Sequence, residues 1–352
     1  MVARRGFLQT MMAMGLMPSV LGTFASGEDK EKRARKVIKP KRLVAGQTLG
    51  LIAPASNVWE NEDIRYAMEI VESLGFRVKA GEYLYHRKGY LAGEDAHRAK
   101  DINRMFADPG VHGIIALRGG YGTPRILPYL DYGTIAANPK VLMGYSDLTA
   151  LLTAISVKTG LVTFHGPMAN QEFSAYTLAQ FKQVLVEAQP DVILAHPPPF
   201  EAVPGKVEHD NRLTRLVPGK ARGALVGGNL SLLTKLMGTP YEPDFTGKIL
   251  FLEEIGEEPY RIDGMLTHLW LTGKLNRVKG IAFGKFTDCE PEGSNSLSIE
   301  HILTERCKEL GVPAIRGLMI GHVADHATLP LGIEAELDVD EGTLKLLEAA
   351  VL

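Results

Sequence analysis

The sequence contains little cysteine and no excess of charge. Its 352 residues include only Cys289 and Cys307, which do not form a Cys-x-x-Cys pair. Two cysteines are too few for a disulfide framework, and their spacing argues against a cysteine-based zinc site. The 39 Lys and Arg residues against 41 Asp and Glu leave a formal net charge of −2. We therefore expect no nucleic-acid partner, because proteins that bind nucleic acids are commonly basic.

The common nucleotide and metal motifs are also missing. The sequence has no Gly-x-Gly-x-x-Gly fingerprint, no phosphate-binding Gly-x-x-x-x-Gly-Lys-Ser/Thr loop and no His-Glu-x-x-His motif. We expect neither a cofactor nor a metal ion, and a nucleotide-binding oxidoreductase has little support. What is present is the composition of a globular protein, with 45% hydrophobic and 23% charged residues. A chain of this length can bury a substantial core in two domains.

The N-terminal segment differs from the rest of the chain. Arg4-Arg5 precedes an uncharged stretch, Met11–Ser26, and lysines and arginines crowd residues 30–42. This pattern predicts a twin-arginine export signal followed by a basic linker over residues 1–42, and hence a periplasmic protein. A disordered or amphipathic extension is the alternative, and the protein would then be cytoplasmic. The uncharged stretch is short and rich in Gly and Met, so we expect no stable membrane span.

Residues 43–170 alternate between strand and helix patterns. Short apolar runs that stop at Gly or Pro predict buried strands, and apolar residues at helical spacing predict the helices between them. This alternation predicts an α/β fold with a parallel, Rossmann-like or flavodoxin-like sheet. The predicted strands are Leu49–Ala53, Arg77–Ala80, Gly113–Leu117, Val141–Gly144 and Val162–Phe164, and the helices are Ile64–Leu74, Asp95–Phe106 and Leu148–Val157.

The remaining chain is expected to form a connection and a second domain. Residues 171–218 should hold a helix and a linker, since the six prolines between Gln189 and Pro218 cannot continue a helix or a central strand. Residues 219–352 should form a mixed α/β domain that ends in a hairpin turned by Asp340-Glu341-Gly342. Its predicted strands are Ala224–Val226, Ile249–Leu252, Gly280–Phe283, Ile315–Met319, Ala335–Val339 and Thr343–Leu347.

Ser146 lies where an apolar strand runs into a helix, in the segment Met143–Ala150. A tight turn there would expose a nucleophilic hydroxyl at the carboxyl end of the sheet, and the helix N-terminus would offer N–H groups to an oxyanion. The segment is not Gly-x-Ser-x-Gly, so the ordinary hydrolase fold is not implied. The alternative is that Ser146 merely caps the helix.

A glycine-rich segment, Arg118-Gly119-Gly120-Tyr121-Gly122, follows the third predicted strand. Glycines at a strand end let backbone N–H groups approach a ligand, so this segment could cradle an anion or complete an oxyanion hole. A simple turn is the alternative.

Two further segments carry an acid pair and a histidine. Glu253-Glu254 closes an apolar strand, which would put a carboxylate beside a cleft, although the pattern alone favours solvent-facing charge that leads into the next helix. His322 follows a strand and could act as a general base. It is four residues from His326, as in a metal-binding helix, but the Gly and Pro around the pair argue against a helix.

Taken in order, these segments closely resemble the LD-carboxypeptidase family, which also includes the microcin-immunity peptidases. The resemblance runs from about Gly50 to Gly332. The segments that carry it are Ala53-Pro54-Ala55-Ser56, Tyr90-Leu91-Ala92-Gly93, Arg118–Gly122, Gly144-Tyr145-Ser146-Asp147, His165-Gly166-Pro167-Met168, Gly227-Gly228-Asn229-Leu230, Leu252-Glu253 with Pro259–Asp263, and Gly321-His322 with Thr328-Leu329-Pro330.

The resemblance implies a homodimeric Ser-Glu-His hydrolase on a two-domain α/β fold. Ser146 matches the nucleophile, His322 the base and Glu253 the acid, with Glu254 as a neighbour. The oxyanion donors would be the backbone N–H groups of Gly120 and Asp147. The implied substrate is a murein tetrapeptide, whose terminal D-alanine would be released from an LD-amide bond in peptidoglycan turnover or recycling.

Other functions stay open beside this one. The same three residues could hydrolyse a microcin-type peptidyl adduct, or the scaffold could bind muropeptides without cleaving them. The sequence also departs from the family at two points. Gly264 follows Asp263 where an arginine is common, and the export-like N-terminus contrasts with the cytoplasmic placement usual for the recycling enzymes.

Overall fold

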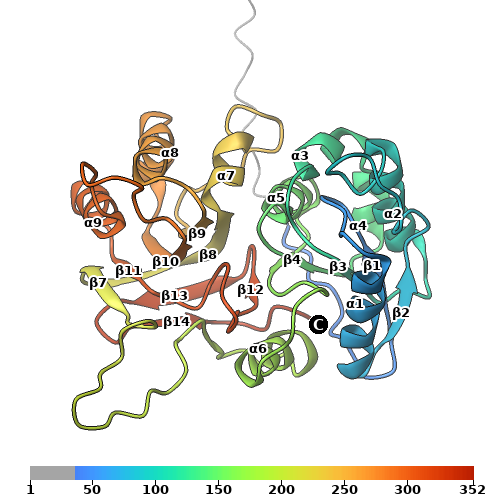
Figure 1. Cartoon of the computed structure of the whole chain (residues 1–352), viewed down its shortest axis with the longest axis horizontal. Coiled ribbons are helices and arrows are strands. Elements are labelled where there is room, and N and C mark those ends of the chain that lie inside the picture. Colours follow the sequence, from blue (N-terminus) through green and yellow to red (C-terminus); the bar gives the residue numbers. More distant parts are fainter. Residues whose placement is uncertain (1–35) are drawn as a thin grey trace, which may run out of the picture. The chain divides into compact units, whose positions relative to one another are not determined.

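The computed structural model describes residues 36–352 (Figure 1). The predicted export signal and most of the basic linker therefore lie outside the described residues, and that prediction is not tested here. No helix within residues 36–352 is both long and apolar enough to cross a membrane. Cys289 and Cys307 are free and buried, and burial raises the pKa of the Cys289 thiol to about 11 and that of Cys307 to about 12.

The first sheet of the described chain has six strands in the order β12-β5-β4-β3-β1-β2. Strands β1 to β5 run parallel, and their order is that of a flavodoxin-like sheet. This confirms the predicted α/β class. The strands are β1 (Thr48–Ile52), β2 (Arg77–Ala80), β3 (Gly113–Ala116), β4 (Val141–Gly144) and β5 (Phe164–His165). The fifth therefore starts two residues later than predicted.

Helices cover this sheet (Figure 1). The predicted face of the second helix, with Ala99, Ile102, Met105 and Phe106, is buried, and each large side chain of this kind contributes about 1.5–3 kcal/mol. The helices predicted with bounds are α1 (Asn61–Ser73), α2 (Asp95–Ala107) and α5 (Leu148–Thr159), and α6 (Ala175–Phe181) lies where a helix was expected within residues 171–218. The others are α3 (Thr123–Ile126), η1 (Leu127–Tyr129), α4 (Tyr132–Ala137) and η2 (Lys182–Val186).

The second sheet of residues 36–352 has eight strands in the order β6-β14-β13-β8-β9-β10-β11-β7. Its centre, β8 to β11, is parallel, and the hairpin β13–β14 and both edges are antiparallel, as expected for a mixed domain. The strands are β6 (Ile193–Leu194), β7 (Thr214–Val217), β8 (Lys220–Asn229), β9 (Ile249–Ile255), β10 (Gly280–Thr287), β11 (Ala314–Arg316), β13 (Glu334–Asp338) and β14 (Thr343–Leu346), and the helices are α7 (Leu230–Leu236), α8 (Pro259–Leu271), η3 (Leu275–Arg277) and α9 (Ile299–Leu310).

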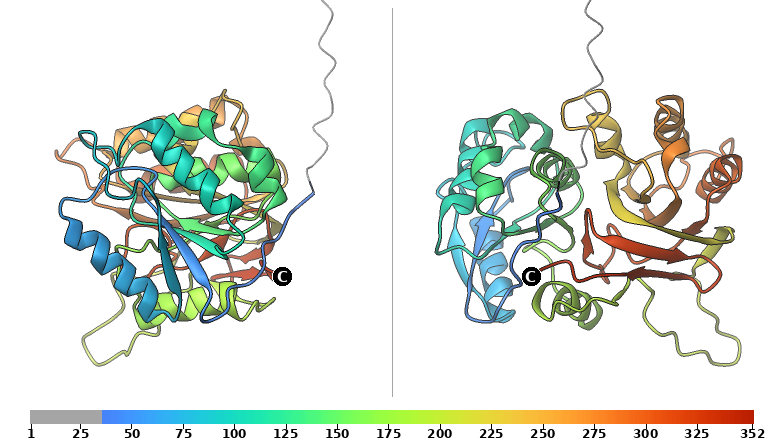
Figure 2. Two further views of the ribbon diagram at one scale, coloured as in Figure 1. Left: turned by 90° about the vertical axis from the view of Figure 1, so that its right-hand side faces the viewer. Right: turned by 180° about the vertical axis from the view of Figure 1, so that it is seen from behind.

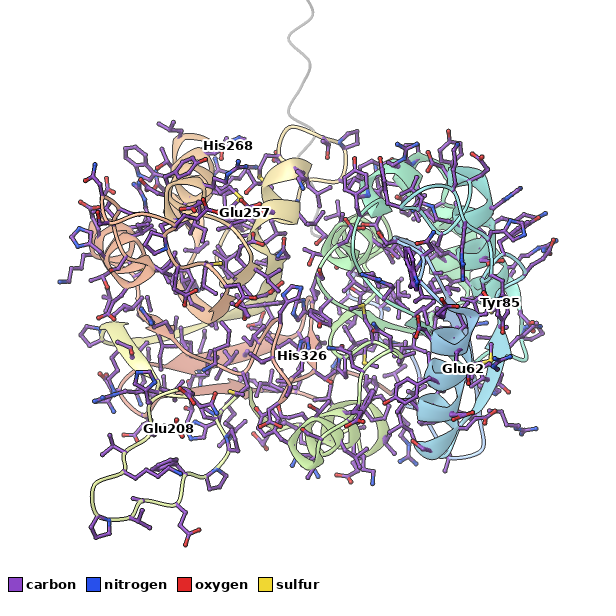
Figure 3. All side chains as sticks on the ribbon, in the orientation of Figure 1. Glu62, Tyr85, Glu208, Glu257, His268 and His326 are labelled. Atoms are coloured by element: carbon purple, nitrogen blue, oxygen red, sulfur yellow. The ribbon has the colours of Figure 1, made fainter. Side chains whose placement is uncertain are left out.

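Two departures from the predicted strands have a physical reason. The proline-rich segment contains β6 and β7, which form the two edges of the second sheet. Edge strands pair on one side only, so prolines beside them are tolerated. Between them the chain projects as a long loop, on which Glu208 lies (Figures 1 and 3). The strand predicted to run to Met319 ends at Arg316, because Gly317 has a φ of +98°.

A short strand from the C-terminal part of the chain joins the first sheet. Strand β12 (Leu329–Pro330) pairs antiparallel with β5 at the edge of that sheet. Helices α5 and α7 also pack against each other where the two sheets meet (Figure 2). The segment between β11 and β12, which carries His322, therefore crosses from one sheet to the other. The domain limits inferred from the sequence remain a prediction.

Candidate functional site

Ser146 occupies a strained turn between β4 and α5. Its φ is +62°, in the left-handed region that residues other than glycine rarely adopt, and such a backbone costs about 1–3 kcal/mol. Gly144 makes the tight turn possible, since a Cβ there would collide with Leu148. The side chain of Ser146 is only partly buried, so the hydroxyl is presented at the carboxyl end of β4.

The hydroxyl of Ser146 is bonded to a histidine and does not cap the helix. Its Oγ lies 3.0 Å from His322 Nε2. The N-cap residue of α5 is Asp147, and no side-chain bond caps that end of the helix. The alternative role suggested by the sequence, that of a helix cap, is therefore not the one that Ser146 adopts.

Glu253 completes a sequence of hydrogen bonds. It lies within β9, and its Oε2 is 2.8 Å from Nδ1 of His322. With the carboxylate accepting from Nδ1–H, Nε2 is left as the acceptor that faces the Ser146 hydroxyl. Glu253 is fully buried, and this burial raises the pKa of its carboxyl, while the hydrogen bond with His322 opposes the shift. The structure thus brings together three residues from three distant parts of the chain.

Glu254 has a different set of partners. Its carboxylate accepts from Asn229 Nδ2 at 2.8 Å and from the N–H of Ser231 at 2.8 Å. These bonds tie the end of β9 to the start of α7. Glu254 therefore holds the scaffold beside Glu253 and does not contact His322.

The glycine-rich segment after β3 lies against Ser146. A Cβ on Gly119 would lie only 3.0 Å from the Cβ of Ser146, so close packing requires glycine there. Gly120, the next residue, has a φ of +112°. Among residues 36–352, no protein acceptor is bonded to the N–H of Gly120 or to that of Asp147. Both predicted oxyanion donors thus retain a backbone N–H for a ligand.

Asp147 links the two segments that carry these donors. Its buried carboxylate accepts from the N–H of Thr123 at 2.7 Å, and the Thr123 hydroxyl donates to its carbonyl. Burial raises the pKa of this carboxyl, and the bonds from Thr123 oppose the shift. The side chain of Asp147 therefore fixes the glycine-rich segment relative to the serine turn.

Behind His322 lies a buried aromatic cluster that consists of Tyr145, His165 and His326. The ring of Tyr145 is 4.9 Å from that of His322 and 4.4 Å from that of His326. Burial lowers the pKa of His326 to about 3 and holds that of His165 well below its usual range, so both rings are neutral. His326 lies in the interior of the molecule (Figure 3). Neither sequence spacing nor composition indicated a cluster of neutral rings at this place.

The described residues hold no group of three or more His, Cys, Asp or Glu side chains arranged to bind a metal ion. The arrangement of Ser146, His322 and Glu253 is suited to nucleophilic chemistry by serine. A hydroxyl bonded to a neutral imidazole, which a buried carboxylate orients, can lose its proton as it attacks a carbonyl. Two nearby N–H groups can stabilise the resulting oxyanion.

Two family models match the chain. The model of the LD-carboxypeptidase N-terminal domain matches residues 49–166, and that of the LD-carboxypeptidase C-terminal domain matches residues 222–337. A probable murein peptide carboxypeptidase of Bacillus subtilis is 43% identical over 319 residues, which cover 89% of this chain and 95% of the relative.

Solved structures are similar over most of the chain. A muramoyltetrapeptide carboxypeptidase from Oxalobacter formigenes is 32% identical, with a TM-score of 0.71, over 85% of this chain and 98% of that protein. The structure of MccF in complex with glutamyl sulfamoyl guanosine is 26% identical, with a TM-score of 0.81, over 89% and 99%. These likenesses agree with the two-sheet α/β fold described above.

Proposed function

Since the chain belongs to the LD-carboxypeptidase family, we propose that it releases the terminal D-alanine of murein tetrapeptides. The chain is a serine-type LD-carboxypeptidase, and its similarity to proteins named for murein peptides and muramoyltetrapeptide supports this substrate class. The bond cleaved would join the L-centre of a diamino acid to D-alanine. The reaction would serve peptidoglycan turnover or recycling.

In the proposed acylation step, Ser146 Oγ attacks the amide carbonyl. His322 Nε2 takes the hydroxyl proton, and Glu253 stabilises the imidazolium that forms. The N–H groups of Gly120 and Asp147 bind the oxyanion, and losing one such donor would cost about 3 kcal/mol of transition-state stabilisation. His322 then protonates the amine of D-alanine, which leaves. Water, deprotonated by the same imidazole, hydrolyses the ester on Ser146.

The observation that carries this proposal is the run of two hydrogen bonds through His322. Ser146 Oγ is 3.0 Å from one ring nitrogen and Glu253 Oε2 is 2.8 Å from the other. The left-handed turn at Ser146 costs free energy, and packing alone does not explain why the protein keeps the hydroxyl bonded to His322 there.

The test is the release of free D-alanine from purified murein tetrapeptide. Wild type should release it, and Ser146→Ala should lose nearly all turnover, because the members of such a set act as a unit. Ser73→Ala, on the exposed face of α1, is the matched control and should retain full activity. Equal release by wild type and Ser146→Ala would contradict the mechanism, and binding of tetrapeptide without release would favour a non-catalytic binding protein.

A second candidate substrate is a microcin-type peptidyl adduct. The likeness to MccF in complex with glutamyl sulfamoyl guanosine favours it. The proposed chemistry would be unchanged, since the same serine would attack an amide carbonyl. A panel that compares tetrapeptide with aminoacyl sulfamoyl nucleosides, by kcat/KM, separates the two.

Export and dimerisation are proposed from the sequence and the family resemblance. Residues 1–42 would direct the folded chain to the periplasm by the twin-arginine route. Fractionation of the native host tests this proposal, and an unprocessed cytoplasmic chain would contradict it. Sedimentation equilibrium of the purified protein tests for the homodimer, and a monomer at micromolar concentration would contradict it.

A further inference from the structure

We propose that Arg118, assisted by the hydroxyl of Ser56, binds the terminal carboxylate of the substrate. This inference rests on the proposed function, because a carboxypeptidase must distinguish a free chain end from an internal peptide. The residue that would recognise this end is a cation next to the nucleophile that no carboxylate of the described residues neutralises.

Arg118 lies at the point of the first sheet where ligands are commonly bound. The chain order β2-β1-β3-β4-β5 reverses direction between β1 and β3. In open α/β sheets, the loops that leave such a pair of strands at their carboxyl ends diverge and form a crevice. Ser56 follows β1, and Arg118 follows β3, so the two residues lie on the two loops that leave this pair of strands. Ser146 follows β4, the next strand along.

The guanidinium lies beside the predicted oxyanion glycine. Nη2 of Arg118 is 3.8 Å from the position that a Cβ on Gly120 would occupy, and Oγ of Ser56 is closer still. Gly119, between Arg118 and Gly120, packs against Ser146. Arg118, Ser56 and the nucleophile therefore border the same two consecutive glycines, Gly119 and Gly120.

Arg118 has most of its donors available. Its guanidinium is bonded to the carbonyl of Asn57, at 3.3 Å, and no Asp or Glu of residues 36–352 lies within ion-pair distance of it. Two arginines nearby differ in this respect, since both Arg98 and Arg125 pair with Asp95. Arg118 is partly buried, which strengthens a charge-assisted bond to a ligand carboxylate, and its planar fork suits two parallel bonds.

Ser56 supplies a second donor. Its Oγ accepts from the N–H of Tyr121 at 3.0 Å, which leaves the hydroxyl hydrogen free to donate to a ligand. The same bond holds Tyr121, and with it the segment after Gly120, against the loop that follows β1. A carboxylate here would thus receive two bonds from Arg118 and one from Ser56.

The test compares two substrates that differ only at the chain end. One is the tetrapeptide with its free carboxylate, and the other carries a terminal carboxamide, which would release D-alaninamide. Wild type should prefer the free acid by about 100-fold in kcat/KM, the magnitude typical of a charge-assisted bidentate bond. Arg118→Gln should lose this preference, because its kcat/KM for the free-acid tetrapeptide should fall while its kcat/KM for the carboxamide substrate stays nearly the same. Arg118→Lys should retain part of it.

The ratio of the two rates does not depend on how much of a variant is folded, because both substrates report on the same molecules. Arg125→Gln is the matched control and should keep the wild-type ratio. A wild-type enzyme without acid preference, or an Arg118→Gln variant that slows on both substrates equally, would overturn the role of Arg118 while leaving the proposed function intact. A wild type that cleaves neither substrate would overturn both.

Discussion

At the residue scale, the site combines strain with available hydrogen-bonding groups. Ser146 holds a positive φ without being glycine, and Glu253 keeps a carboxylate in full burial where its pKa is raised. Each feature costs folding free energy, and each is what the proposed chemistry requires: an exposed hydroxyl and a fixed imidazole. The packing of the surrounding strands, β4 and β9, is what maintains both.

The strain at Ser146 can be measured. We expect Ser146→Gly to be more stable than Ser146→Ala by about 1 kcal/mol, since glycine adopts a φ of +62° without a Cβ penalty. Both variants lose the hydroxyl, so the comparison isolates the backbone. Urea unfolding followed by circular dichroism gives the difference. If Ser146→Ala proved equally stable or more stable, the turn would not be strained.

At the scale of elements, helix α6 positions the loop that carries His322. Thr177 is buried, and its hydroxyl donates to the carbonyl of Ala324 at 3.2 Å and accepts from the N–H of His326 at 2.9 Å. The hydroxyl of Ser174, the N-cap residue, donates to Asp325 at 2.5 Å. Three bonds from one short helix therefore hold the loop that follows His322.

We expect Thr177→Val, which keeps the shape but removes the hydroxyl, to lower kcat about 10-fold with little change in KM, since the His322 loop would lose two of its bonds. Thr177→Ser should restore kcat. Thr159→Val is the control, because Thr159 is also a buried helical threonine, and its hydroxyl bonds only to the carbonyl of Ile155 and the N–H of Leu161, neither of them in the His322 loop. If both valine variants lost the same free energy of unfolding and Thr177→Val kept the wild-type kcat, helix α6 would have no role in positioning the His322 loop. Steady-state kinetics and urea unfolding provide the two readouts.

Helices and strands were predicted best from the sequence where a local pattern, such as an apolar run that ends at a turn residue, is sufficient to define them. Strands β2 and β4 match their predicted bounds, because each is a short run closed by a turn residue. Helices α3 and α4 were not predicted, since they are short and span a proline-rich stretch without apolar periodicity. Strand β12 could not be foreseen either, as two residues acquire strand geometry only by pairing with β5. The edge strands β6 and β7 likewise depend on their partners.

For the site, the sequence indicated Ser146, Glu253 and His322 because each follows or closes an apolar strand. Taken alone, the local patterns favoured or allowed a non-catalytic role for each of them, such as a helix cap or a solvent-facing charge. The order of segments typical of the family is what indicated a catalytic role. Thr177 carried no such signal, and His165 belonged to a family segment without a role being inferred for it. The roles of both residues depend on which loops fold against them. Long-range contacts of this kind are set by tertiary packing, which a local pattern does not encode.

At the scale of the whole molecule, the site exists only where both sheets are folded and joined. Ser146 belongs to the first sheet, Glu253 to the second, and His322 to the segment between β11 and β12 that crosses between them. The N–H of Asn229 also donates to the Thr149 hydroxyl across the junction, at 3.0 Å. Loss of the junction would separate the three residues, so activity should report on the junction.

The neutral histidines behind His322 should make that junction sensitive to acid. His326 has a folded pKa of about 3 against about 6.5 in an unfolded chain, so the unfolded state binds more protons between these values. The stability that His326 provides is therefore full above pH 6.5 and is lost as the pH falls toward 3. Asp101, Asp147 and Glu253 have raised pKa values and act in the opposite direction, so the histidine effect must be isolated by substitution.

The substitution His326→Phe isolates the contribution of His326 to the pH dependence of stability. The variant keeps a ring against Tyr145 and removes no hydrogen bond that the described residues make to the imidazole. The acids are common to both proteins, and their contributions cancel in the difference. Between pH 7 and pH 5, wild type should lose about 2 kcal/mol of unfolding free energy relative to His326→Phe, at about 1.4 kcal/mol for each pH unit below 6.5. Urea unfolding of both proteins at the two pH values gives this difference. A difference that stays constant with pH would mean that His326 takes up its proton as readily in the folded protein as in the unfolded chain, and the buried cluster would then have to hold a charge at pH 5.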